Sequence, residues 1–206
     1  LPDSPSSTSM NNEDTVPNLF VSNNISFISQ NVRSLLSKKQ YINIDAIINT
    51  MEKHNISAYL IQETWLDGDF EKIINGYNLF HHGLKKQICK RGQKGVAIIL
   101  SPDLAKMYNE SGCLAPIIPT NENNIEFGRL IGIKLTIQSE FQEKGAFRKK
   151  NKLNGVSSFN LILISSYHPN EIENQIIFNN YLSSIYSEIS SSTILISGHD
   201  MNSCIG

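Results

Sequence analysis

Several apolar, β-branched runs in this sequence are followed closely by polar residues that could do chemistry. Runs of this composition are typical of strands, and the sheet holds side chains at strand ends in place while leaving them open to solvent. The polar residues are Asn31 after ISFIS, Glu63 after AYLI, Tyr167 and His168 after LILISS, and Asp200 with Asn202 after TILIS. Convergence of the strand ends explains this repeated pattern most simply. We therefore predict that these residues share one site.

The residue types favour a hard divalent cation and phosphate chemistry. Carboxylate and amide oxygens suit Mg²⁺ or Mn²⁺, and Mg²⁺ commonly keeps several waters while using only one or two carboxylates. Glu63 and Asp200 would be enough to hold it. Such a cation polarises a phosphoryl oxygen while a nearby carboxylate orients or deprotonates water, so the set fits phosphodiester hydrolysis. Taken singly, each residue would more often be a solvated, turn or packing residue.

Strands and helices must position these residues. Strands are predicted at 25–29, 58–61, 96–100, 127–137, 159–169 and 193–197. An amphipathic helix over 38–55 is predicted from the helical spacing of Tyr41, Ile44, Ile47, Ile48 and Met51. The mixture of strands and helices indicates the α/β (α+β) class.

A second helix is predicted after Pro169. Asn170 could cap its first turn, with Glu173 three residues later in a capping-box arrangement. The expected apolar face consists of Ile172, Phe178, Leu182, Ile185 and Ile189.

Two polar stretches flank or interrupt the predicted elements. Residues 138–158 have the composition of an inserted loop. Residues 1–23, rich in Ser, Pro, Asn and acidic side chains, indicate a disordered leader or linker before a domain spanning 24–206.

The formal net charge of −1 argues against a protein that binds polyanions with its whole surface, so we expect any nucleic-acid contact to be local. The candidate nucleic-acid-binding residues are Lys85, Lys86, Lys90, Arg91 and Lys94. Solvated loop charge without any phosphate contact is an equally good interpretation of this cluster. A second basic cluster contains Arg148, Lys149, Lys150 and Lys152.

Other features limit the location and the metal chemistry. No apolar run approaches the roughly 18 residues of a membrane span. Cys89, Cys113 and Cys204 lack the spacing of a zinc site or a disulfide framework, which indicates reduced thiols and an intracellular protein, nuclear or cytoplasmic. His81 and His82 would face opposite sides of a strand, so they are not expected to share a metal.

The motifs SQNVRSL, LIQETWL, GVAIILSP, LISSYHP and ILISGHDMNSCIG together resemble those of the endonuclease/exonuclease/phosphatase superfamily. They occur in the family's order, from about residue 25 onward. QNVRSL, QETWL and the GDxN-like segment that continues to SCIG are most similar to the endonuclease domains of non-LTR retrotransposons, which are apurinic/apyrimidinic endonuclease-like.

The resemblance implies a four-layer α/β/β/α sandwich of the deoxyribonuclease type that uses Mg²⁺ (or Mn²⁺). Glu63 would be the principal metal ligand, with Asn31 helping to hold the metal or the phosphate. Asp200 would orient or activate water, Asn202 would contact the scissile phosphate, and Tyr167 would stabilise the transition state. His199 stands where the GDxN motif usually has a small residue.

The departures from the family pattern predict a truncated domain. Arg33 occupies the position of a second acidic ligand found in some apurinic-type members. The second half of the family fold, with its terminal Ser-Asp-His segment, is missing. An incomplete sandwich would leave a sheet face uncovered, so we expect aggregation or dependence on a partner.

The resemblance implies a DNA endonuclease of the non-LTR retrotransposon type that leaves a 3′ hydroxyl. Its expected partners are DNA and a downstream reverse transcriptase region of the same polyprotein. Two alternatives stay open: a catalytically inactive remnant or binding module of the same fold, and a phosphatase acting on inositol phosphates or nucleotides.

Overall fold

The computed structural model describes residues 25–35, 43–85, 94–121, 123–141 and 155–202. The described residues form eight strands and three helices. In chain order these are β1 (Phe27–Asn31), α1 (Ile44–His54), β2 (Ala58–Gln62), β3 (Phe70–Ile74), β4 (Tyr77–His82), β5 (Val96–Leu100), α2 (Pro102–Glu110), β6 (Leu130–Phe141), β7 (Gly155–Tyr167), α3 (Ile172–Ser187) and β8 (Thr193–Asp200). The predicted leader 1–23 and the second basic cluster lie outside the described residues.

The strands of the described part form two sheets. The first has the order β1-β2-β5-β4-β3 and the second the order β6-β7-β8. In each sheet one pair of strands is parallel, β1 with β2 and β7 with β8, and the remaining pairs are antiparallel. Parallel neighbours need a crossover connection. Helices α1 and α3 supply the two crossovers.

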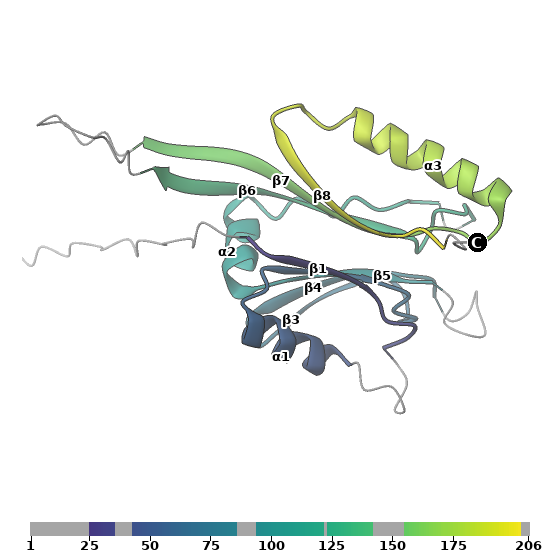
Figure 1. Cartoon of the computed structure of the whole chain (residues 1–206), viewed down its shortest axis with the longest axis horizontal. Coiled ribbons are helices and arrows are strands. Elements are labelled where there is room, and N and C mark those ends of the chain that lie inside the picture. The colour runs from purple at the N-terminus through teal and green to yellow at the C-terminus, as the bar shows by residue number, and fades with distance from the viewer. Residues whose placement is uncertain (1–24, 36–42, 86–93, 122, 142–154, 203–206) are drawn as a thin grey trace, which may run out of the picture.

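The sheets pack face to face, with α1 on the outer face of the first and α3 on the outer face of the second (Figure 1). Strand β5 illustrates this arrangement, because Val96, Ile98 and Leu100 face the second sheet while Ala97 and Ile99 face α1. The predicted four-layer α/β/β/α fold is therefore confirmed. No helix among the described residues is long and apolar enough to cross a bilayer.

Helix α1 forms where the apolar spacing predicted it, although it is shorter than expected. The Asn43 side chain accepts a hydrogen bond from Ala46 N at 2.7 Å and caps the first turn. Asn55 ends the helix in the left-handed conformation with φ of 51°. Three predicted face residues, Ile47, Ile48 and Met51, are buried against the first sheet. Tyr41 lies outside the described residues.

Helix α3 begins later than predicted. Its first helical hydrogen bond runs from Gln175 N to Glu171 O, so the N-cap position belongs to Glu171 and not to Asn170. Phe178 and Leu182 are buried against the second sheet as predicted. Ile172, which was predicted on the same face, is instead 76% exposed.

The predicted inserted loop at 138–158 is wrong at both ends. Strand β6 continues to Phe141 and β7 starts at Gly155, because the antiparallel ladder runs on as far as the pair formed by these two residues. Gln138 and Ser158 form one pair in this extension and are both exposed. The hairpin therefore projects beyond the first sheet (Figure 1) and lacks the apolar pattern of a buried strand.

The sequence predicted that an incomplete sandwich leaves a sheet face uncovered, and this is wrong for the two sheet faces that meet in the described part of the chain. Buried residues of β2, β4 and β5 pack directly against those of β6 and β7, and α2 closes one end of this core (Figure 1). Most of the exposed large apolar side chains in the described ranges lie on α3 and β8, namely Ile172, Ile176, Ile177 and Ile194, while Ile73 is exposed on β3. Aggregation or partner dependence stays a prediction.

Candidate active site

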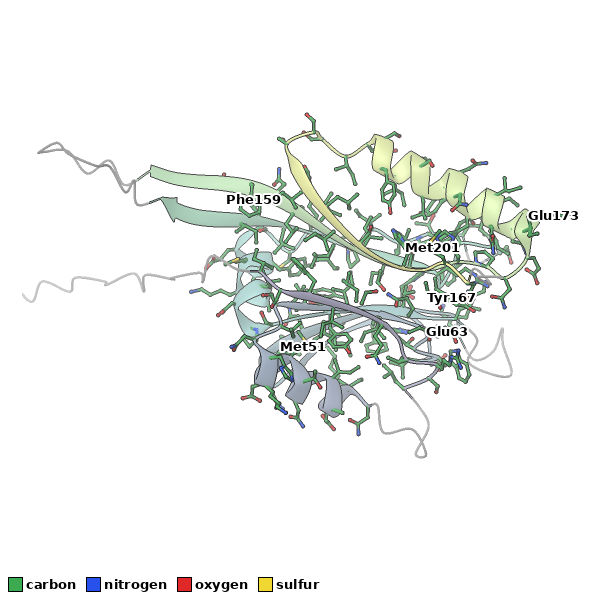
Figure 2. All side chains as sticks on the ribbon, viewed as in Figure 1. Met51, Glu63, Phe159, Tyr167, Glu173 and Met201 are labelled. Carbon is green, nitrogen blue, oxygen red and sulfur yellow. The ribbon has the colours of Figure 1, made fainter. Side chains whose placement is uncertain are left out.

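The ends of the two parallel pairs lie at the same edge of the sandwich. Asn31 ends β1 beside Gln62, the last residue of β2, and Glu63 follows directly. In the second sheet Tyr167 ends β7 beside Asp200, which ends β8. Figure 2 shows Glu63 and Tyr167 at one edge, on facing sheets. The structure thus brings the predicted strand-end residues together.

Asn31 is the centre of the arrangement. Its Nδ2 donates to Glu63 Oε1 at 2.6 Å and to Asp200 Oδ2 at 2.5 Å. Its Oδ1 accepts from Arg33 N at 2.9 Å. Two carboxylates carried by different sheets therefore share one amide donor. In this orientation the nitrogen of Asn31 faces them, so a ligating role for its Oδ1 requires the amide to turn.

Glu63 adopts a backbone conformation that is unfavourable for a non-glycine residue. Its φ is 56°, in the left-handed region. The backbone after β1 runs alongside and holds it, since Val32 N donates to Gln62 O at 3.0 Å and Ser34 N donates to Glu63 O at 2.7 Å. The carboxylate therefore leaves the end of β2 in a direction fixed by its neighbours.

Asn202 makes hydrogen bonds within the chain, to Asp200 and to its neighbour in space, His168. Its backbone N–H donates to Asp200 Oδ1 at 3.1 Å, and its Nδ2 donates to His168 O at 2.6 Å. One Asp200 oxygen thus faces Asn202 and the other faces Asn31. The predicted phosphate contact of Asn202 stays a prediction, because this amide already has a partner within the chain.

A close approach of β8 to β1 makes the shared donor possible. A Cβ on Gly198 would lie 2.3 Å from Ser29 Oγ, so only glycine fits at this crossing. Beside it, Gln62 Nε2 donates to Ser165 Oγ at 3.0 Å, which links the first sheet to β7. The two sheets are therefore joined by polar contacts directly behind the carboxylates.

Arg129 is a site residue that the sequence reasoning missed. Its guanidinium carbon lies 4.7 Å from the centre of the Tyr167 ring, and its Nη1 donates to His168 O at 3.2 Å. Burial lowers the pKa of Arg129, while Tyr167, Glu171 and Glu63 act in the opposite direction. An arginine keeps its charge under such conditions. Its buried Nε has no hydrogen-bond partner among the described residues.

His199 is a structural residue in this arrangement. Its Nδ1 lies 2.5 Å from Ser166 Oγ and its Nε2 lies 2.9 Å from Tyr186 OH, so both ring nitrogens are occupied. Burial lowers the pKa of His199. The neighbouring His168 is 2% exposed and packs edge-on against Phe178. These rings fill the space between β7, β8 and α3.

The predicted basic cluster is described only in part. Lys85 is exposed, and Lys94 is half-buried with its Nζ 3.5 Å from Phe127 O. The cluster's other members, Lys86, Lys90 and Arg91, lie outside the described residues, as does the second basic cluster. A contact with nucleic acid therefore stays a prediction.

The donor set fits a cation that needs few protein ligands. Within the described ranges, no group of three or more His, Cys, Asp or Glu side chains could hold a metal ion. Glu63 and Asp200 nevertheless place two carboxylates around one donor atom. Since Mg²⁺ uses one or two carboxylates and completes its shell with water and phosphate, these two residues fit it.

Comparison with known proteins gives likeness in structure only. No protein-family model matches the sequence, and no curated protein matches it. Similar solved structures are the endonuclease domain of TRAS1, a telomere-specific non-LTR retrotransposon, and an endonuclease/exonuclease/phosphatase family protein from Leptotrichia buccalis C-1013-b. Both are of the kind that the sequence motifs resemble.

The likeness is modest in both cases. The TRAS1 domain is 11% identical with a TM-score of 0.45, and the match covers 86% of this chain and 59% of that one. The Leptotrichia protein is 15% identical with a TM-score of 0.47, and the match covers 87% of this chain and 67% of that one. This chain therefore spans about three fifths of the length of the TRAS1 domain.

Proposed function

We propose that this chain carries a phosphodiester hydrolase site that uses Mg²⁺ (or Mn²⁺) and nicks DNA. The observation that carries the proposal is the contact of one Asn31 amide with both the Glu63 and the Asp200 carboxylates. Carboxylates this close repel one another unless a donor or a cation lies between them. A hard divalent cation with a substrate phosphate suits this pair of oxygens.

The residues present have distinct places in such a reaction. Glu63 and Asp200 would hold the cation, which when bound polarises a phosphoryl oxygen and stabilises charge on the leaving oxygen. Asp200 would also orient the attacking water and take up its proton. Because Asn202 N–H binds one Asp200 oxygen, the side chain is held with its other oxygen toward Asn31.

Arg129 and Tyr167 supply the complementary charge. The guanidinium is half-buried against the Tyr167 ring, where its charge is less screened than in open solvent. It would attract the substrate phosphate, and the Tyr167 hydroxyl would donate to an oxygen that becomes more negative in the transition state. Asn31 would bind the same phosphate only when its amide nitrogen releases one of the two carboxylates.

DNA is the proposed substrate because the motifs resemble those of non-LTR retrotransposon endonucleases. In that setting the product has a 3′ hydroxyl, and a downstream reverse transcriptase region of the same polyprotein is the proposed partner. The exposed Lys85 near the start of the basic loop would add a local phosphate contact.

A plasmid-nicking assay tests the proposal. Supercoiled plasmid is incubated with the chain in Mg²⁺, in Mn²⁺ and in EDTA, and nicked ends are tested for extension by a DNA polymerase. We expect nicking in either metal, none in EDTA, and extendable 3′ ends. Glu63→Gln and Asp200→Asn, which keep shape but remove charge, should each abolish nicking. Glu52→Gln, an exposed site on α1, is the matched control and should nick normally.

Other outcomes separate the alternatives. Release of phosphate from nucleotides or inositol phosphates without nicking would favour a phosphatase. Absence of both activities, with DNA or Mg²⁺ still bound, would favour an inactive binding module.

A further inference from the structure

His81 and His82 are adjacent on β4, and neither ring is open to solvent. His81 Nδ1 lies 2.7 Å from Gly68 O and its Nε2 lies 2.6 Å from Thr64 Oγ1. A carbonyl only accepts, so the proton is on Nδ1 and Nε2 accepts from the Thr64 hydroxyl. Both nitrogens of this neutral ring are therefore satisfied.

His82 is fixed in the same tautomer by different partners. Gly128 N donates to its Nε2 at 2.9 Å, and its Nδ1 lies 2.8 Å from Asp69 Oδ1. A backbone N–H only donates, so Nε2 is unprotonated and Nδ1–H donates to the carboxylate. The Phe127 ring packs edge-on against His82 at 4.5 Å between ring centres. The imidazole is thus held on several sides.

The partners of the two histidines are themselves linked. Thr64 N donates to Gly95 O at 3.0 Å, and Gly95 N donates to Gly128 O at 2.8 Å. Since Thr64 binds His81 and Gly128 binds His82, the hydrogen bonds form a closed ring that starts and ends on consecutive residues of β4. We call this closed cycle of five hydrogen-bonded residues, His81, His82, Thr64, Gly95 and Gly128, the histidine ring; the term does not refer to the imidazole of either histidine.

Two glycines make the histidine ring possible. Gly95 has φ of 111°, and a Cβ there would lie 2.3 Å from Thr64 Oγ1. Gly128 has φ of 70°. Both conformations are disfavoured for other residues, and the approach at Gly95 leaves no room for a side chain. The loops are therefore packed as closely as their backbones allow.

Each side of the histidine ring adjoins a site residue. Glu63 immediately precedes Thr64, and Arg129 immediately follows Gly128. Glu63 is also strained, with φ of 56°, so it needs support from its neighbours. A shift of either loop would move the carboxylate or the guanidinium relative to Asp200 and Tyr167.

We propose that His81 and His82 are positioning residues, which hold Glu63 and Arg129 in place through Thr64 and Gly128. This inference rests on the proposed hydrolase function. Neither imidazole touches the reacting groups. Their effect is exerted through the loops, and a displacement of about 1 Å at a site of this kind can lower the rate roughly a hundredfold.

Matched variants test each side of the histidine ring. Thr64→Val removes the hydroxyl at constant shape, and Thr64→Ser keeps it. His82→Leu removes the acceptor for Gly128 N, and His82→Gln keeps an acceptor at a similar reach. Thr136→Val on β6 deletes a hydroxyl contact to Asn160 Oδ1 on β7 and serves as the control.

Two readouts are measured on every variant. The first is nicking, separated into kcat and KM. The second is quenching of the single tryptophan, Trp65, which follows Thr64 and whose backbone N–H donates to Lys94 O at 3.1 Å. Trp65 reports the loop position without any need for activity. Circular dichroism establishes which variants are folded.

Thr64→Val and His82→Leu are expected to lower kcat roughly tenfold to a hundredfold with little change in KM. Thr64→Val should also make Trp65 easier to quench. Thr64→Ser, His82→Gln and Thr136→Val should behave like the wild type.

Normal kcat in folded Thr64→Val and His82→Leu would overturn the proposal. If the wild type does not nick, the hydrolase function fails by itself, and unchanged quenching in Thr64→Val would then overturn the histidine ring. If Thr64→Val and His82→Leu do not fold, the conservative variants decide the matter. Failure of Thr64→Ser and His82→Gln to fold as well would overturn the proposal, because both keep the hydrogen-bonding group.

Discussion

Asn31 and Asp200 lie 169 residues apart in the sequence and are joined by a 2.5 Å hydrogen bond between the two sheets. The same Asn31 nitrogen binds Glu63. The amide therefore occupies the position between two carboxylates, where it offsets their repulsion in the absence of a cation. This relationship makes the charge at position 31 a direct probe of the site.

Asn31→Asp should make the fold depend on a divalent cation. The change replaces the shared donor by a third carboxylate of the same shape, so we expect a loss of about 1–3 kcal/mol in the free energy of unfolding in EDTA. Adding Mg²⁺ should recover more stability in the variant than in the wild type, because a bound ligand stabilises the folded state. Thermal unfolding in EDTA and in Mg²⁺ measures both effects. Equal Mg²⁺ responses in the two proteins would contradict the site.

Gly198→Ala should separate the sheets at the site. The new Cβ would lie 2.3 Å from Ser29 Oγ and 2.7 Å from Ser29 Cβ, so β8 must move away from β1. We expect a loss of about 1–3 kcal/mol in unfolding free energy and a loss of nicking. Ser29→Gly in the same chain should restore part of both, whereas Ser29→Ala keeps the clashing Cβ and should restore less. Additive effects of Gly198→Ala and Ser29→Gly would show that the crossing is not the cause.

Stability should fall as the pH falls from about 6.5 toward 4. Burial lowers the pKa of His81 from 6.5 to about 4, and it also lowers the pKa values of His82, His168 and His199. At a pH between the folded and the unfolded pKa, the unfolded chain binds more protons than the folded chain. The stability contributed by the neutral buried histidines is therefore complete above about pH 6.5 and is lost progressively as the pH falls below it. The contribution of His81 alone is about 3 kcal/mol at most. Urea unfolding at several pH values measures the slope, which His81→Asn should flatten. A pH-independent free energy of unfolding would refute the buried neutral rings.

Tyr167→Phe should lower the rate without unfolding the chain. The phenyl ring keeps its contact with the Arg129 guanidinium, while the hydroxyl that would stabilise the transition state is lost. We expect kcat for nicking to fall roughly a hundredfold. Tyr167→Leu should lose the stacking as well, with an added cost of about 1 kcal/mol in stability. If Tyr167→Phe nicks at the wild-type rate, the hydroxyl has no role in the reaction.

The strand-end residues could be predicted from the sequence because each follows an apolar run, and the sheet then determines where the run ends. Helix α2 was missed although its start carries a local signal: Ser101 accepts from Leu104 N as the N-cap, and Pro102 occupies the first turn. That signal follows a strand directly, without a loop between them. The Asn170 cap was predicted from its capping-box spacing to Glu173. This prediction was wrong, because the N-cap position of α3 belongs to Glu171.

Arg129 and the histidine ring could not be predicted in the same way. Arg129 is one basic residue at the start of a strand, and only its packing on Tyr167 from the neighbouring strand gives it significance. The histidine ring consists of contacts between loops far apart in the sequence. Local patterns specify elements, whereas these contacts exist only after the two sheets have docked.

The crossing of β8 over β1 also determines when the site can exist during folding. Contacts between residues so far apart in sequence form slowly, because the entropy of closing a long loop is lost before the contacts contribute any favourable energy. We therefore expect the two carboxylates to be brought together late in folding, so that a chain with only one sheet formed would lack the site. A cation that binds both carboxylates would select only chains that have completed this step, so its binding could serve as a kinetic marker of native assembly.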